Sequence, residues 1–128
     1  NHMMKFLEYI LKRGAKVVVT EIPDPGPNPT SINNCFEKVF RSEVKNTENI
    51  YRIVEMSMAE KDWATWNFMQ WFVKEQTEEE TLAIELLDRI KIAGGEKADD
   101  NALYTLNQDL NTKPNDAILA QDVTVEKP

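Results

Sequence analysis

The apolar positions divide the chain into helical stretches separated by segments without a helical period. Residues 3–13 carry apolar side chains three and four positions apart, and Gly14 follows where a helix C-cap belongs. From Lys16 onward a β-branched run leads into four prolines that end at Pro29, and prolines exclude a helix. Short loops join only adjacent antiparallel helices, so this segment predicts a long connection between opposite ends of a helical bundle.

Two longer helices are predicted after this connection. The first follows an N-cap at Thr30 or Ser31 and runs to about Glu60. Its inward positions alternate in steps of four and three: Phe36, Phe40, Glu43, Thr47, Ile50, Val54 and Ser57. The second runs from Trp63 to Ala93 and ends at two glycines. Its aromatic first half predicts packing in a core and at a subunit interface.

A short helix and a tail complete the pattern. Apolar residues at helical spacing predict a helix over Asn101–Leu110, and residues 111–128 have no period and predict a mobile tail. The fold class is therefore all-α, with one domain over residues 1–110.

Composition narrows the possible partners. A length of 128 residues suits one domain, and the net charge of −7 disfavours DNA or RNA because phosphate binding needs a basic face. No apolar run approaches the roughly 20 residues of a membrane span, and no secretory signal is recognisable. The single cysteine, Cys35, is expected to pack in the core, which fits a reducing, cytoplasmic environment.

Carboxylates interrupt the apolar stripe of the second long helix. Steps of four and three place six residues on one face: Phe68, Phe72, Glu75, Glu79, Leu82 and Leu86. Two acids therefore point inward. An unpaired buried carboxylate costs several kcal/mol, so a cation, a proton or a metal ion is expected to compensate it.

The preceding helix contributes an acid at the same height. Glu43 and Glu79 each lie 18 residues from Lys61, where the two helices are expected to turn back on each other. At about 1.5 Å per residue they come level and can bridge one metal ion. Gln76 adds an amide oxygen for a ligand, water or dioxygen, and Glu75 and Glu78 can hold a further cation. Oxygen-rich ligands without thiolate favour hard cations, and iron is the common redox metal in bundle cores.

Two simpler interpretations remain open at this point. The cluster Glu78–Glu80 is also typical of a solvated helix face, in which case no metal is held. His2, the only histidine, lies at helical spacing from Phe6 and Ile10, but a His-Met pair near a chain start is also typical of a cloning remnant.

Several runs resemble the bacterial-type non-haem ferritins, over His2 to about Leu110. The most specific is Asn67-Phe-Met-Gln-Trp-Phe-Val-Lys-Glu-Gln-Thr-Glu-Glu-Glu80. Supporting runs are Phe6-Leu-Glu-Tyr-Ile-Leu-Lys-Arg-Gly14, Val17–Pro23, Phe36-Glu-Lys-Val-Phe40 and Glu60-Lys-Asp62. The resemblance implies a ferritin-like four-helix bundle, to which this chain contributes the end of the second helix, the crossover, the third and fourth helices and a short fifth helix.

The resemblance also implies a function and assigns residues to it. It implies iron storage by a ferroxidase, which oxidises Fe(II) with dioxygen or peroxide at a di-iron centre. It also implies a homo-oligomeric octahedral shell of twenty-four subunits, and no haem is expected. Glu43 is similar to the carboxylate that binds the second iron of the di-iron centre, and Glu79 is similar to the ligand shared by the two irons. Gln76 is similar to the glutamine beside the di-iron centre. His2 is similar to the histidine ligand, and this similarity overturns its interpretation as a cloning remnant. Glu75, Glu78 and Glu79 are similar to the acids of a third iron site.

The resemblance lacks one part of the family pattern. The first family helix and the glutamate three residues before His2 do not occur, and the chain begins with Asn1 rather than methionine. We therefore expect upstream helices of the same subunit or a companion chain to complete the di-iron site. The alternative is a non-catalytic structural or split component of a ferritin shell, whose acids bind cations without turnover.

Overall fold

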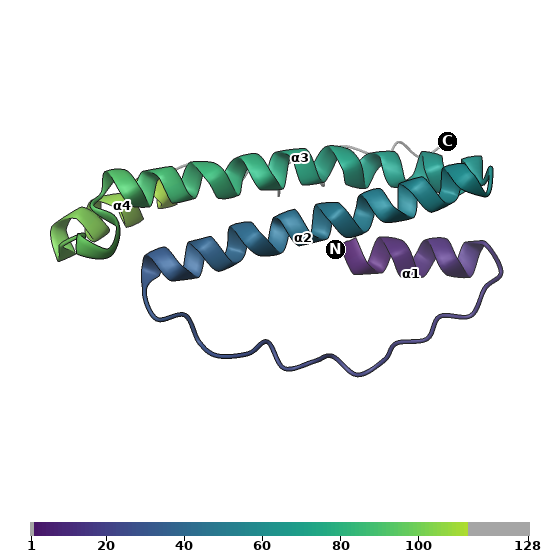
Figure 1. The fold of residues 1–128 in the computed structure, drawn as a ribbon, viewed down its shortest axis with the longest axis horizontal. Helices are drawn as coiled ribbons and strands as arrows, with labels where there is room; N and C mark the ends of the chain where they lie inside the picture. Colours follow the sequence, from purple (N-terminus) through teal and green to yellow (C-terminus); the bar gives the residue numbers. More distant parts are fainter. Residues whose placement is uncertain (1, 113–128) are drawn as a thin grey trace.

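The computed structural model describes residues 2–112, and every regular element within that range is a helix (Figure 1). Helix α1 spans His2–Lys12, α2 Ile32–Ala59, α3 Trp63–Ile92 and α4 Asp100–Thr112, with a short 3-10 helix η1 over Gly95–Lys97. The prediction of an all-α chain is confirmed. Residues 111 and 112, assigned to the tail by the sequence, end α4 instead; the rest of the predicted mobile tail lies outside the described residues.

Helices α2 and α3 form an antiparallel hairpin (Figure 1). The turn between them is tight: Lys61 has a left-handed φ of 56°, and the Asp62 amide donates to the Ser57 carbonyl at 2.8 Å. The Asp62 carboxylate then caps α3 by accepting a bond from the Thr65 amide at 3.1 Å. The predicted break at residues 61 and 62 is therefore confirmed.

The proline-rich segment crosses the full length of the hairpin. Helix α1 ends where Gly14 adopts a φ of 77° and the Ala15 amide donates to the Ile10 carbonyl at 3.1 Å. The chain then returns to the opposite end of the hairpin, where Ser31 caps α2 by accepting a bond from the Asn34 amide at 3.0 Å (Figure 1). Helix α1 consequently runs in the same direction as α2, as the predicted crossover requires.

The apolar core lies where helices α1, α2 and α3 approach one another. Met69 and Phe72 of α3 and Ile50 of α2 are buried, and partly buried side chains pack around them: Phe6, Ile53, Val54, Phe68, Trp71 and Val73. The predicted α2 stripe is confirmed at Thr47, Ile50 and Ser57, which are all buried.

The predicted stripe on α3 is only partly correct. Phe72 and Glu75 are buried, but Leu82 is 43% exposed, and Trp63, expected in the packed aromatic half, is 61% exposed. The α2-facing side is lined instead by Met69, Gln76, Ala83, Leu87 and Ile90. At 100° per residue this row lies beside the predicted one, which faces α1. The described part of α1 begins at His2 and reaches this row as far as Glu79.

Within the described residues, none of the helices has both the length and the apolar character that crossing a membrane requires.

Candidate metal centre

Three potential ligands meet where the first turn of α1 lies against the middle of α3. One atom each from His2, Glu75 and Glu79 falls within 4.8 Å of the others. The His2 Nε2 is 3.7 Å from Glu75 Oε2, which is too long for a hydrogen bond but close enough for a shared cation. Glu75 and Glu79 are one helical turn apart, so a single face of α3 supplies both carboxylates.

Aromatic rings hold His2 on this face. The imidazole meets Trp71 edge to face at a centroid distance of 5.3 Å and Phe72 at 5.8 Å. The His2 side chain is nevertheless 39% exposed, whereas that of Glu75 is 10% exposed. Within the described residues, the Glu75 side of the site is therefore the more buried one.

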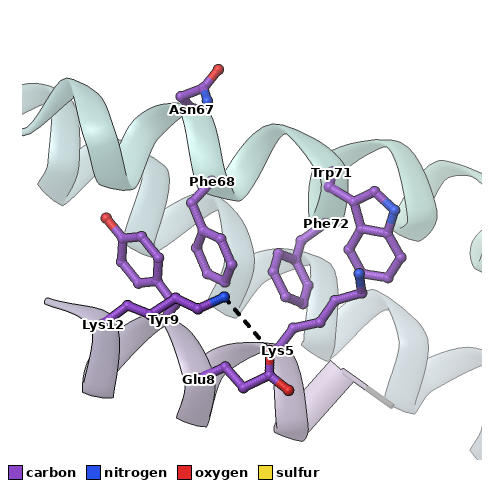
Figure 2. Close-up of a pocket in the computed structure, with 8 residues that line it drawn as sticks. All are labelled: Lys5, Glu8, Tyr9, Lys12, Asn67, Phe68, Trp71 and Phe72. Carbon is purple, nitrogen blue, oxygen red and sulfur yellow. Dashed lines mark ion pairs between the residues drawn. The ribbon is translucent and has the colours of Figure 1, made fainter. Parts of the chain in front are cut away.

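The packing of α1 on α3 continues beyond His2 along an aromatic groove (Figure 2). Phe6 stacks on Phe72 at 4.3 Å, and Tyr9 stacks on Phe68 at 4.0 Å between ring centroids. Lys5 covers the Trp71 ring at 4.1 Å, and Lys12 pairs with Glu8 at 3.9 Å along the rim. These contacts fix the position of α1 and hence of His2.

A second polar cluster links α3 to α2 beside the three ligands. Gln76 is 2% exposed, and its Nε2 lies 3.2 Å from the Glu43 carbonyl, 3.3 Å from Glu43 Oε2 and 3.2 Å from Thr47 Oγ1. The Glu43 oxygens can only accept, so the amide nitrogen of Gln76 must face them. Asn46 Nδ2 also donates to Glu43 Oε2, at 3.3 Å.

The electrostatics of the site favour a positive charge. Burial raises the pKa of Glu79 above its usual value of 4.5, and the nearby Glu43 carboxylate raises the same pKa further. His2 acts in the opposite direction, while Glu75 and Glu78 add to the increase in the pKa of Glu79. Glu79 is thus influenced by three other carboxylates and one imidazole, and a proton or a metal cation relieves the repulsion among the carboxylates.

The structure brings together most of the residues that the sequence singled out. His2, Glu75 and Glu79 form the cluster, Gln76 is buried beside it, and Glu43 contacts Gln76 and influences Glu79. Glu43 does not belong to the group of mutually close ligands. Glu78 is exposed and pairs with Lys74 at 3.6 Å, so its predicted part in a further cation site stays a prediction.

Sequence reasoning missed the role of Thr47 in this network. The residue was assigned to the inward stripe of α2, and its hydroxyl donates to the Glu43 carbonyl at 3.1 Å while accepting from Gln76. A buried hydroxyl one turn after an inward glutamate was the available signal, because a buried polar group needs a partner.

The donor set is one imidazole nitrogen and several carboxylate oxygens without thiolate. Such a set suits divalent first-row metals and harder cations, and its negative charge favours a metal ion whose charge increases during a reaction. Binding of a redox-active cation is the chemistry that this arrangement supports.

Comparisons with known proteins show what this chain is similar to. Residues 1–93 match a family model described as Ferritin, ferritin-like domain. A bacterial non-heme ferritin from Campylobacter jejuni is 35% identical over 108 residues, which cover 84% of this chain and 63% of the relative. A probable bacterial non-heme ferritin-like protein from Haemophilus influenzae is 32% identical and is covered to 64%.

Solved structures give the same result. An open-pore ferritin from the archaeon Archaeoglobus fulgidus superposes with a TM-score of 0.81 at 36% identity, covering 88% of this chain and 68% of that one. The two bacterial relatives named above, from Campylobacter jejuni and Haemophilus influenzae, are longer than this chain, which spans a little under two thirds of their length.

Proposed function

The chain belongs to the ferritin family, and from that premise we propose that it takes part in iron storage as a subunit that oxidises Fe(II) to Fe(III). The observation that carries the proposal is the convergence of His2, Glu75 and Glu79 within 4.8 Å beside the Glu43–Gln76 pair. The oxidised iron would be stored as mineral inside a hollow, cytoplasmic shell of twenty-four copies.

The chemistry follows from the donor set. His2, Glu75, Glu79 and Glu43 bind Fe(II) as substrate, and the carboxylates stabilise the higher charge of Fe(III). Each Fe(II) gives up one electron, while dioxygen or peroxide accepts electrons and protons and leaves as peroxide or water. Gln76 offers its amide oxygen to bound water or oxidant, and Glu78 holds iron at a third position near Glu75 and Glu79.

The remaining ligands of a di-iron centre would come from outside the described residues. We assign them to upstream helices of the same subunit or to a companion chain, which would also cover the open flanks of α2 and α3. Intact-mass measurement of the native assembly identifies which of the two supplies them.

Oxygen consumption after addition of Fe(II) to that native assembly tests the proposal. The Glu43→Ala and Glu79→Ala variants are expected to lose rapid oxidation while the shell keeps its size on gel filtration, because the first removes a carboxylate beside the cluster and the second removes one within it. Glu85→Ala, which removes an exposed acid of α3 outside the cluster, serves as the matched control and should keep the wild-type rate.

The same oxygen-consumption measurement distinguishes the ferroxidase from the second candidate function, a non-catalytic component of the shell. Unchanged oxidation kinetics in Glu43→Ala and Glu79→Ala would refute the assigned roles. Iron uptake by the wild type without stoichiometric consumption of oxidant would instead support a non-catalytic shell component.

A further inference from the structure

We infer that Thr47 is a positioning residue of the metal centre, whose hydroxyl orients the Gln76 amide and through it the Glu43 carboxylate. The inference rests on the proposed function, because it concerns how the same site is organised. Thr47 contributes no ligand atom; it acts through two residues that lie beside the clustered ligands.

The direction of each hydrogen bond in the network can be deduced. The Thr47 hydroxyl has one hydrogen, which it donates to the Glu43 carbonyl at 3.1 Å. Its oxygen lone pair therefore accepts from Gln76 Nε2, at 3.2 Å. The second hydrogen of the Gln76 amide is then directed toward Glu43, whose carbonyl oxygen lies at 3.2 Å and whose Oε2 lies at 3.3 Å.

The consequence is that both functional side chains keep one oxygen for the site. All hydrogen bonds that Gln76 makes with described residues use Nε2, which leaves Oε1 for a ligand or water. Glu43 likewise engages Oε2 with Gln76 and Asn46 and leaves Oε1 for a cation. Without the hydroxyl, the buried Gln76 amide keeps only the two Glu43 oxygens as acceptors and loses its hydrogen bond to a residue that binds no metal, so its orientation is less constrained.

Burial makes this arrangement rigid. Thr47 is 8% exposed and Gln76 is 2% exposed, so water competes little for these bonds. Removal of a residue that hydrogen-bonds to a metal ligand and orients it typically changes the metal affinity by roughly 10- to 100-fold.

Two substitutions at one position separate orientation from packing. Thr47→Val keeps the shape and β-branching but removes the hydroxyl, whereas Thr47→Ser keeps the hydroxyl and removes a methyl group. We expect Thr47→Val to weaken Co(II) binding about tenfold, to alter the visible absorption of the Co(II)-loaded assembly, and to slow Fe(II) oxidation. Thr47→Ser should retain the wild-type affinity and spectrum even where its melting temperature falls.

Thr81→Val provides the matched control. Thr81 is an exposed threonine of α3 whose hydroxyl bonds to the Thr77 carbonyl of its own helix at 2.7 Å, so its loss should leave Co(II) binding unchanged.

The outcomes distinguish this inference from the proposed function. Wild-type Co(II) affinity and spectrum in Thr47→Val would overturn the positioning role while leaving the ferroxidase intact. A loss of affinity in Thr47→Ser as large as in Thr47→Val would also overturn it, since packing of the methyl group would then be the cause. Absence of Co(II) binding and Fe(II) oxidation in the wild type would refute the proposed function itself.

Discussion

The two halves of helix α3 differ in how they are packed. From Trp63 to Glu79 it packs against both α2 and α1, and this half contains Met69 and Phe72, which are at most 1% exposed. From Glu80 to Ile92 the described residues offer it α2, η1 and an ion pair from Arg89 to Asp109 of α4. This half exposes Leu82 at 43%, Ile84 at 45% and Ile92 at 86%.

The difference shows what α1 contributes. The α2-facing row is buried in both halves, since Ala83, Leu87 and Ile90 continue the line of Met69 and Gln76. Within the described residues, α1 covers the neighbouring row in the first half and brings His2 to Glu75 and Glu79. The candidate metal centre therefore lies on the part of α3 that packs against α1 as well as α2.

The largest effect is expected when a large side chain is shortened in the half of α3 that packs against both α1 and α2. Phe72→Ala should lower the free energy of unfolding by about 3–5 kcal/mol, because the ring fills the space between Phe6 of α1 and the α2 core. Leu82→Ala in the other half should cost less than about 1 kcal/mol, because the side chain is largely solvated. Urea denaturation of both variants measures the difference, and equal losses would contradict the comparison.

A smaller effect is expected from the polar contact that ties α1 to the start of α3. Thr65 Oγ1 donates to Asp62 Oδ2 at 2.6 Å, so the Tyr9 hydroxyl donates to Thr65 Oγ1 at 2.9 Å. Tyr9→Phe should cost about 0.5–1.5 kcal/mol in the same measurement. Tyr104→Phe, at an exposed ring of α4, is the control and should be neutral; a neutral Tyr9→Phe would show that stacking alone holds α1.

The smallest effect expected is a pH-dependent one at the boundary between the halves. Burial raises the pKa of Glu79, so the folded state holds this proton more tightly than the unfolded state does. The stability contributed by Glu79 is then fully present below its usual pKa of 4.5 and is lost as the pH rises through the folded value.

Thermal melts of metal-free protein against pH test this sign. Glu79→Gln should raise Tm near neutral pH, and the gain should disappear below about pH 4.5, where the wild-type carboxyl is protonated in both states. Glu85→Gln, at an exposed acid of α3 that is not among the groups raising the pKa of Glu79, should produce no such gain. A gain independent of pH would mean that the charge of Glu79 is not its cause.

Much of the architecture followed from local rules that act within a few residues. Gly14, Ser31 and Asp62 end or begin their helices as their types predict, because caps and left-handed turns depend on the nearest backbone groups. The long crossover could be predicted from its prolines and its length, and Figure 1 shows it as the irregular segment that spans the hairpin.

The candidate site was predictable in composition and less so in arrangement. Helical spacing and the family resemblance singled out the acids, the histidine and Gln76. Helical counting placed Glu43 and Glu79 level and opposite each other, and Glu43 does influence the pKa of Glu79, yet the close group is His2, Glu75 and Glu79. Glu43 turns instead toward Gln76 and Asn46, whose amides compete for its carboxylate.

Periodicity and the nearest backbone groups were enough to predict the helices, the caps at Gly14, Ser31 and Asp62, the crossover and the acids on the inner side of α3. The face of α3 that meets α1, the row of α3 that meets α2 and the contact between Thr47 and Gln76 are apparent only in the folded chain. These outcomes depend on how far each helix is rotated about its own axis and how far side chains reach, and residue spacing along one chain contains neither quantity.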